Sequence, residues 1–436
     1  MEPASHDVVV VGASIAGTTA AVLFARRGLR VALLERHTDP AAYKVICTHY
    51  IQASATPTIA RLGLAETLAK AGAVLNSFEL WTRWGWIRAP AGWPSRFPTH
   101  GYSIRRSKLD PMLRHLAAST PGIDLQFGYK VERLLEENGA VCGVVARTPD
   151  GQMHELRARL MLGADGRTSA VADLARLPTR RKPHGRFMYF AYFQNLPLRT
   201  GSEAQMWFLE PDVGYAFPND DGVTLLACMP VAARLPEFKS DLEGAFRRFF
   251  EGLPEAPPIG GAERISPILG QLDMPNIVRQ TTGPGVALVG DAALAADPLF
   301  GVGCGWAFQS AEWVVEATAD ALRDRTSLPS ALRRYRTRHR KALAGHEARI
   351  SDFSTGRPYN ALERLMNSAA ARDAASAQLL HEFAARHIRV RDFLAPSAIA
   401  HALWVNIRHA LHHGGPRPTG GPFHDTPATG IAGTAH

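Results

Sequence analysis

The chain has 436 residues, of which 46% are hydrophobic and 20% are charged. This length and balance suit two or three folded domains and exclude a disordered or fibrous protein. The formal net charge of +9 comes from short, scattered basic groups without interleaved aromatic residues, which argues against nucleic-acid binding. One such group, at 336–341, is most simply the polar face of a helix.

The four cysteines lie far apart without C-x-x-C spacing, a pattern that disfavours a metal site and a disulfide framework. The first residues carry no basic n-region, and Gly, Ser and Thr interrupt the apolar stretch at 8–25. We therefore expect no metal, no signal peptide, no membrane insertion and a cytoplasmic location.

The first predicted element is a strand at 8–11 that runs into a glycine turn and a helix of small residues. Gly12 and Gly17 flank Ser14, which takes the place of the second glycine in the usual G-x-G-x-x-G pattern. The glycines let the backbone approach a pyrophosphate at the helix N-terminus, where free N–H groups favour an anion. The turn therefore predicts a bound dinucleotide, either FAD or NAD(P).

The second predicted strand, at 30–34, ends at Glu35. A carboxylate at this position can accept hydrogen bonds from both ribose hydroxyls and would repel a 2′-phosphate. This position favours FAD or NAD over NADP.

Three later segments, at 102–106, 160–166 and 286–291, add further strand ends to the same domain. The second holds Asp165 between glycines, and the third ends in Gly290-Asp291. A glycine-rich loop at 297–305 then leads into a helix. We expect Asp291 beside a ribityl or ribose hydroxyl, and the N–H groups of the loop beside negative charge on a reduced flavin.

Two inserts have a different pattern. Residues 182–264 contain short alternating aromatic runs with a hairpin turn at 219–222, which predicts an antiparallel sheet, and the Trp-rich segment at 78–98 is expected to add strands to it. We assign 1–77, 99–181 and 265–345 to a discontinuous Rossmann-like FAD domain, and the two inserts to a substrate domain. Residues 346–413 are predicted to be helical and 414–436 to be a disordered tail.

In order and spacing, the glycine turn, Glu35-Arg36, Arg106, the turn at 163–166 and Gly290-Asp291 resemble the FAD-dependent monooxygenases of the para-hydroxybenzoate hydroxylase superfamily. The resemblance covers residues 6–345. It implies that Gly12, Ser14, Gly17, Glu35, Arg36, Arg106 and Asp291 contact FAD, and that Asp165 helps to position the pyrophosphate of FAD or NAD(P)H.

Two segments differ from the aromatic hydroxylases. Leu294 follows the Gly-Asp-Ala-Ala stretch, where those enzymes usually have His. The segment 297–300 is more similar to the branch that holds flavin-dependent halogenases and geranylgeranyl reductases. Halogenation would predict a Trp-x-Trp-x-Ile-Pro signature and a poised lysine, which residues 84–88 and Lys44 only approximate; packing is the simpler interpretation of the tryptophans.

The fold class expected is therefore α/β, with an inserted antiparallel sheet and C-terminal helices. The cofactor contacts expected are Gly12, Ser14, Ile15, Ala16, Gly17, Glu35, Arg36, Arg106, Asp165, Gly290, Asp291, Pro298, Gly301, Val302, Gly303 and Cys304. A substrate chamber is expected to be lined by Tyr189, Tyr192, Trp207, Tyr215 and Phe217. Cys47-Thr48-His49 could hold a nucleophile and a base, but a structural role is the simpler interpretation.

The resemblance implies a monooxygenase of secondary metabolism that uses FAD, O2 and NADH or NADPH, or reduced flavin from a partner reductase. Its substrate would be an apolar or aromatic small molecule, oxygenated through a flavin C4a-hydroperoxide, so that no protein residue need act as acid or base. The alternatives are a reductase or dehydrogenase, a halogenase, and a flavin-binding redox sensor without turnover.

Overall fold

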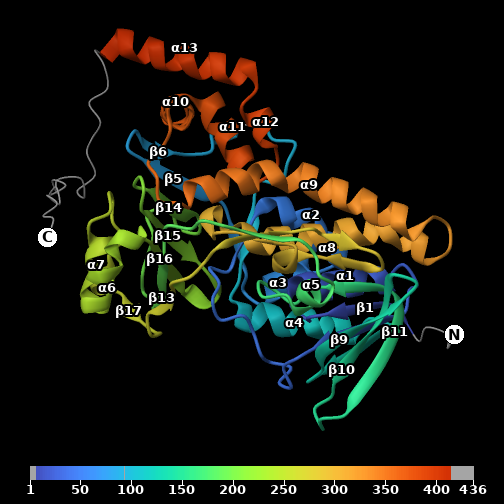
Figure 1. Cartoon of the computed structure of the whole chain (residues 1–436). Coiled ribbons are helices and arrows are strands. Elements are labelled where there is room, and N and C mark those ends of the chain that lie inside the picture. Colours follow the sequence, from blue (N-terminus) through green and yellow to red (C-terminus); the bar gives the residue numbers. More distant parts are fainter. Residues whose placement is uncertain (1–5, 93, 414–436) are drawn as a thin grey trace, which may run out of the picture.

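The computed structural model describes residues 6–92 and 94–413, so the tail predicted at 414–436 lies outside the described residues. Two large sheets lie side by side, and the C-terminal helices lie above them in Figure 1. No helix in the described ranges is both long enough and apolar enough to cross a membrane.

The first sheet has the strand order β20-β21-β11-β1-β2-β8, and its neighbours from β21 to β8 run parallel. Its strands are β1 His6–Val11, β2 Val31–Glu35, β8 Ile123–Phe127, β11 Met153–Gly163, β20 Thr282–Gly283 and β21 Val286–Leu288. The apolar run predicted at 8–11 forms the buried end of β1, as expected for a strand covered on both faces. The carboxyl ends of β1, β2 and β11 therefore meet at one edge of the sheet.

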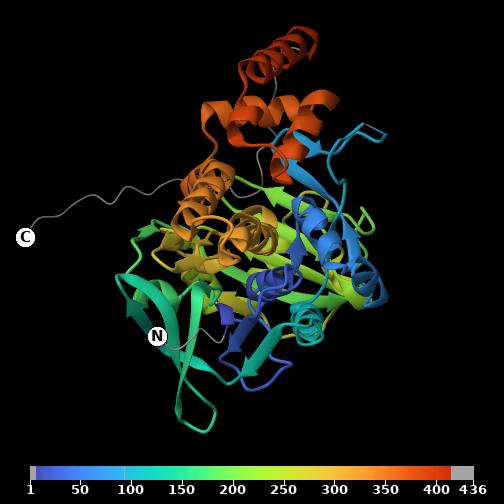
Figure 2. The same cartoon turned by 90° about the vertical axis from the view of Figure 1, so that its right-hand side faces the viewer.

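Helices cover this sheet and position the strand ends. They are α1 Ile15–Ala25, α4 Arg106–Ala118, α5 Ala170–Leu174, α8 Val302–Leu322 and α9 Leu328–Phe353, with α2 Thr56–Leu62 and α3 Ala65–Lys70 beside them. Helix α8 is buried along most of its length between α1 and α9 (Figures 1 and 2). Both α1 and α8 begin at loops that follow strand ends.

The sequence patterns did not predict a long hairpin that extends the first sheet. Strands β9 Lys130–Glu137 and β10 Ala140–Arg147 pair antiparallel with each other, and β10 pairs with β11. Their inner side chains pack with α5 in a separate core cluster that includes Val131, Val144 and Leu156.

The second sheet is the predicted antiparallel sheet, with the order β17-β13-β16-β15-β14-β5-β6 and β18 paired to β13. Its strands are β5 Phe78–Thr82, β6 Gly85–Ile87, β13 Met188–Gln194, β14 Ala204–Phe208, β15 Val213–Pro218, β16 Thr224–Met229, β17 Glu263–Arg264 and β18 Leu269–Gln271. The Trp-rich insert adds β5 and β6, although β5 joins β14 in parallel. Because β18 lies beyond residue 264, the sheet extends past the predicted boundary.

One face of this sheet packs toward the first sheet, and the other is covered by α6 Leu235–Ser240 and α7 Leu242–Glu251, helices that were not predicted. Two three-stranded sheets link the halves: β3 Tyr50–Ile51, β7 Gly101–Ser103 and β4 Val74–Asn76, and β12 Thr179–Lys182, β19 Asn276–Arg279 and β22 Leu294–Ala295. The C-terminal region is helical as expected, with α10 Ala361–Ala370, α11 Ala374–Ala384, α12 Val390–Phe393 and α13 Pro396–His413.

Candidate functional site

A cavity of about 570 Å³ runs from the ends of β1 and β2 to the start of α8. Of the predicted cofactor residues, the following line it: Gly12, Ser14, Ile15, Ala16, Glu35, Arg36, Arg106, Asp165, Asp291, Pro298, Gly301, Gly303 and Cys304. We call this cavity the FAD cleft. The fold thus brings together segments that are spread over almost three hundred residues.

The glycine turn forms one end of the FAD cleft. Gly12 has a φ of +103°, and a Cβ built on it would lie 2.5 Å from the carbonyl oxygen of Ala164. A Cβ on Gly17 would lie 1.8 Å from the carbonyl oxygen of Gly12. Gly17 is not among the residues that line the cleft, and its direct contact with FAD stays a prediction; the lack of a side chain there lets α1 begin close to the strand.

Glu35 lies at the end of β2 and is buried. Its Oε2 accepts a hydrogen bond from the backbone N–H of Ala13 at 2.9 Å, and its Oε1 accepts one from the N–H of His37 at 3.0 Å. Both strand-end loops therefore hold this carboxylate in the position that the sequence indicated for a ribose contact.

Arg106 begins α4 and connects several parts of the cleft. Its guanidinium donates to Asp110 one helical turn later, at 2.8 and 3.0 Å, and to Ser14 Oγ at 2.6 Å. Sequence reasoning missed Arg114, whose Nε donates to the carbonyl oxygen of Ala13 at 3.0 Å and so braces the glycine turn from α4. The i, i+4 and i, i+8 spacing on a predicted helix was the available signal.

Asp291 lies in the middle of the cleft, where its carboxylate pairs with Lys44 Nζ at 2.8 Å. Burial alone would raise the pKa of Asp291, but the positive charges of Lys44, Arg167 and Arg106 together outweigh burial and lower it. The neighbouring Gly290 does not line the cleft; its N–H donates to Ser310 Oγ at 2.9 Å. Val302 is buried in the core as well, and its contact with FAD, like that of Gly290, stays a prediction.

Two thiols meet at the α8 end of the cleft. Cys47 Sγ lies 3.8 Å from Cys304 Sγ, and the N–H of His49 donates to Cys47 Sγ at 3.3 Å. The hydrogen bond from Cys304 lowers the pKa of Cys47, and His49 and Arg106 lower it further. The pKa of Cys304 is raised by the same pairing and by burial.

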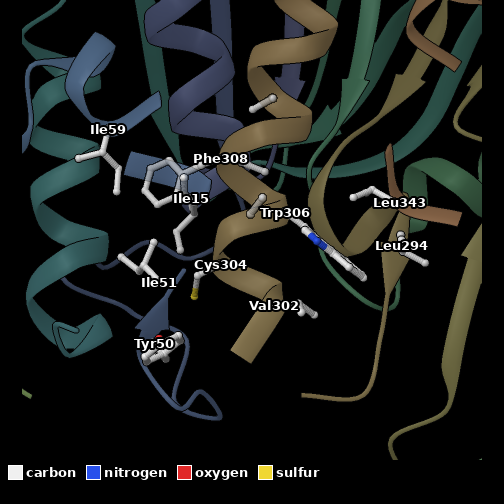
Figure 3. Close-up of a cluster of buried hydrophobic side chains, with 14 of the residues drawn as sticks. Ile15, Tyr50, Ile51, Ile59, Leu294, Val302, Cys304, Trp306, Phe308 and Leu343 are labelled. Carbon is white, nitrogen blue, oxygen red and sulfur yellow. The ribbon is translucent and has the colours of Figure 1, made fainter. Parts of the chain in front are cut away.

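Sequence reasoning missed this thiol pair because its members are 257 residues apart in the chain. Figure 3 shows Cys304 on the side of α8 that faces Tyr50 and Ile51. Contact between the two thiols depends on how β3 packs against α8, which no local pattern records.

An imidazole and a phenol lie beside the thiols. His49 Nδ1 accepts a hydrogen bond from the N–H of Arg106 at 3.1 Å, so Nε2 carries the proton in neutral His49 and donates to Tyr192 Oη at 2.5 Å. Burial raises the pKa of Tyr192, which keeps the phenol protonated. This arrangement can hold and move a proton next to Cys47.

The antiparallel sheet supplies the roof of the cleft through Met188 and Gln271, and the following loops add Met274, Ala296 and Pro298. Tyr192, Tyr215 and Phe217 face the same side but form the layer behind these residues; the Phe217 ring packs on Tyr50 with centroids 5.0 Å apart. The methionines had no motif to mark them.

Two of the predicted chamber residues point the other way. Tyr189 stacks on Phe238, and Trp207 Nε1 donates to the carbonyl oxygen of Pro254 on the outer face of the sheet. Successive side chains of a strand alternate between faces, so Tyr189 lies opposite Tyr192 on β13, and Trp207 opposite the neighbouring Phe208 on β14. The prediction that Tyr189 and Trp207 line the chamber is therefore wrong.

The cleft fits a flavin dinucleotide. The N-termini of α1 and α8 both reach it, the buried Glu35 carboxylate lies at one end, and an apolar roof lies at the other. At Gly303 the nearest atom to a built Cβ is Asp291 Oδ1 at 3.9 Å, so the loop leaves room against the cleft. The site has a nucleotide end and a ring end, as FAD requires.

Known proteins agree with this geometry. A family model described as an FAD binding domain matches residues 5–232. Digeranylgeranylglycerophospholipid reductase 1 of Methanopyrus kandleri is 28% identical over 344 residues, which cover 76% of this chain and 85% of the reductase. Kynurenine 3-monooxygenase of Salinispora arenicola is 27% identical over 357 residues, or 77% of each chain.

Among solved structures, the myxobacterial chondrochloren halogenase CndH has a TM-score of 0.69 at 22% identity, over 92% of this chain and 98% of the halogenase. That likeness shows the shared fold. The family model, however, matches more than half of the chain, and the resemblance drawn from the motifs is confirmed. The chain belongs to the FAD binding domain family and is an FAD-dependent oxidoreductase.

Proposed function

We propose that the chain is an FAD-dependent monooxygenase that inserts one oxygen atom from O2 into an apolar or aromatic small molecule, with NADH or NADPH as electron donor. The supporting observation is that all four carboxylates that line the FAD cleft are already engaged by other groups. Glu35 accepts backbone N–H groups, and the other three pair as Asp110 with Arg106, Asp165 with Ser169 and Asp291 with Lys44.

Among the described residues, these engaged carboxylates leave no acidic side chain of the cleft free for general acid or base work on a substrate. Bound FAD would supply two-electron reduction and the reaction with O2. The apolar roof of Met188, Met274 and Pro298 excludes water from the ring end. Backbone N–H groups at the start of α8, with Lys44, favour negative charge there.

The same geometry gives the His49–Tyr192 pair a role. Neither His49 nor Tyr192 lines the FAD cleft, so this pair would act on a bound molecule only through Cys47, which lines the cleft and accepts a hydrogen bond from the backbone N–H of His49. Arg106 holds the imidazole in that orientation through its backbone N–H.

The test uses purified protein with FAD, NADH or NADPH, and a panel of aromatic and apolar compounds. The proposal predicts that one compound stimulates NAD(P)H oxidation, consumes an equal amount of O2 and gains one oxygen atom. Flavin that is reduced and reoxidised without any oxygenated product would contradict the proposal.

A second function, an FAD-dependent reductase, is favoured by the Cys47–Cys304 pair. Two thiols 3.8 Å apart, one with a lowered pKa, can hold two electrons or deliver a proton beside the flavin. The Methanopyrus kandleri relative is named as a reductase. Product formation under nitrogen with pre-reduced enzyme would select this function.

Halogenation has less support from the residues that suggested it. Lys44 pairs with Asp291 inside the FAD cleft, and Trp86 packs edge-on against Trp207 on the outer face of the sheet. We expect the product to be the same with and without halide salts.

A further inference from the structure

A second hollow lies on the other side of α8 from the FAD cleft. It has a volume of about 1150 Å³ and lies between α8, α9, the loop at 96–97 and the segment 386–392. Figure 3 shows Cys304 and Trp306 leaving α8 toward different sides, and Trp306 lies on the side of Leu343 of α9. Cys304 lines the FAD cleft, whereas Trp306 lines this hollow, which we call the basic cleft.

The basic cleft is strongly cationic. Helix α9 contributes Arg333, Arg334, Arg338 and Lys341, and the other two segments contribute Arg96, Arg386 and Arg389. Asp392 is the one carboxylate that lines it within the described residues, and it pairs with Arg389 at 2.9 Å. Arg338 pairs with Glu316. Within the described part of the chain, no carboxylate pairs with Arg96, Arg333, Lys341 or Arg386.

The deepest cation is incompletely satisfied. Arg386 is 9% exposed, and its Nη1 donates to His346 Nδ1 at 3.2 Å, but its Nε and Nη2 have no hydrogen-bond partner. The indole Nε1 of Trp306, which is 3% exposed, also has none. These donors are buried and without partners, so they add to the positive potential at the inner end of the cleft.

The protonation states keep the cleft selective for anions. Burial and the nearby Arg349 lower the pKa of Arg386 to about 9, which a bound anion would reverse. Burial and Arg386 lower the pKa of His346 to about 3, so that this imidazole stays neutral and can accept from Arg386. At neutral pH the guanidinium remains charged, and no second charge on His346 opposes it.

Flat rings lie among the cations. Phe97 stacks on His387 with centroids 4.7 Å apart and planes within 2° of parallel. The guanidinium carbon of Arg338 lies 5.5 Å from the Trp313 ring centre, and that of Arg96 lies 4.8 Å from the Phe97 ring centre, so guanidinium planes as well as rings face the cleft. Guanidinium groups bind phosphate oxygens in pairs, and aromatic rings accept a stacked base. A lone inorganic anion would leave most of the hollow unfilled.

We propose that the basic cleft binds a nucleoside diphosphate, with the diphosphate against Arg386 and Lys341, the base against the aromatic rings and the guanidinium groups stacked on them, and Arg333 adding positive charge about 12 Å farther along α9. This site differs from the FAD cleft and does not depend on the oxygenation proposed above. Helix α8 separates the two clefts, so the ligand would act as an effector or anchor rather than as a hydride donor.

The test is calorimetric titration of the FAD-loaded enzyme with ADP, adenosine and inorganic pyrophosphate. We expect ADP to bind at one site per chain, at least tenfold more tightly than pyrophosphate or adenosine, without release of flavin. No saturable heat with ADP, or equal affinity for ADP and pyrophosphate, would overturn the proposal.

Variants locate the site on one helix. Arg333→Gln with Lys341→Gln removes two exposed cations that line the basic cleft, and we expect ADP affinity to fall at least tenfold. Arg336→Gln with Arg340→Gln makes the same charge change on exposed residues of α9 outside the cleft and should change affinity less than twofold. Equal losses in both double variants would show general charge attraction and overturn the assignment.

Discussion

The FAD cleft and the basic cleft lie on opposite sides of α8 and are built in different ways. In the FAD cleft the backbone approaches the ligand through glycines, and each carboxylate has a partner. In the basic cleft long cationic side chains from three separate segments converge, and several have no carboxylate partner among the described residues. Both clefts join segments that are far apart in the sequence, but the FAD cleft is preorganised by tight glycine turns at strand ends, whereas the basic cleft is formed by long side chains of packed helices and loops.

The largest expected effect is a loss of FAD binding, with the basic cleft left unchanged. Gly12→Val adds a side chain where the φ is +103° and the Ala164 carbonyl oxygen lies 2.5 Å from the new Cβ, a backbone contact that cannot swing away. We expect FAD affinity to fall more than about 100-fold. Flavin absorbance of the purified variant, with circular dichroism for folding, measures this.

The matched control is Gly261→Val, because Gly261 has no neighbouring atom within 4 Å of a built Cβ and no positive φ. This variant should retain its flavin. If Gly12→Val also purified with full flavin content, the nucleotide end of the cleft would be misassigned.

A smaller loss of flavin should follow from Glu35→Ala. The change removes the acceptor for the N–H groups of Ala13 and His37 as well as the ribose contact, and we expect about 2 kcal/mol, or roughly 30-fold, in FAD affinity. Fluorescence titration of apoprotein with FAD measures the change, with the exposed Glu66→Ala as control. If Glu35→Ala and Glu66→Ala bound FAD with equal affinity, Glu35 would not be part of the FAD site.

Lowering the pH should reduce the free energy of unfolding through two buried histidines of α9, His339 and His346. Burial lowers the pKa of His339 to about 4, and His346 is lowered to about 3. The unfolded chain therefore binds more protons below pH 6.5, and stability is lost as the pH falls from about 6.5 toward 4, at roughly 1.4 kcal/mol per pH unit for each histidine.

Urea unfolding at pH 7.5, 6 and 5 measures this dependence. His339→Phe keeps a ring in the buried site and should flatten the slope, whereas the exposed His412→Gln should leave it unchanged. An unchanged slope in His339→Phe would show that His339 does not titrate on unfolding.

The smallest effect concerns thiol reactivity in the FAD cleft. The lowered pKa of Cys47 predicts that iodoacetamide modifies it several-fold faster than Cys142, whose pKa is raised by burial, when flavin is removed at pH 7. Added FAD should slow the reaction at Cys47 and leave Cys142 unaffected. Peptide mass spectrometry gives both rates, and faster modification of Cys142 would contradict the thiolate assignment.

Most of the parallel half was predictable from sequence. Glu35 and Asp165 follow buried strands whose carboxyl ends meet at one edge, so spacing alone brought them together. Spacing does not distinguish a residue that touches the ligand from one that permits its approach, as at Gly17 and Gly290, which lie next to cleft-lining residues but are not among them. Glycine is needed at positions 17 and 290 because a side chain there would prevent the close packing of α1 and α8.

In the antiparallel half the strands could be predicted, but which of their side chains point toward the FAD cleft could be predicted only in part. Tyr189 and Tyr192 are three residues apart on β13, so in any register their side chains point to opposite faces, one toward the outer helices and one toward the FAD cleft. Helices α6 and α7 cover that outer face and could not be located without the strand register. The basic group at 336–341 was interpreted as a solvated face, yet Arg338 and Lys341 within it line the basic cleft.

Turnover under isotopically labelled oxygen tests the central claim most directly. With the compound that most stimulates NAD(P)H oxidation, ¹⁸O2 should place one labelled atom in each product molecule, and the Gly12→Val variant should give no product. Product that lacks the label, or that forms at the same rate under nitrogen, would contradict oxygen transfer.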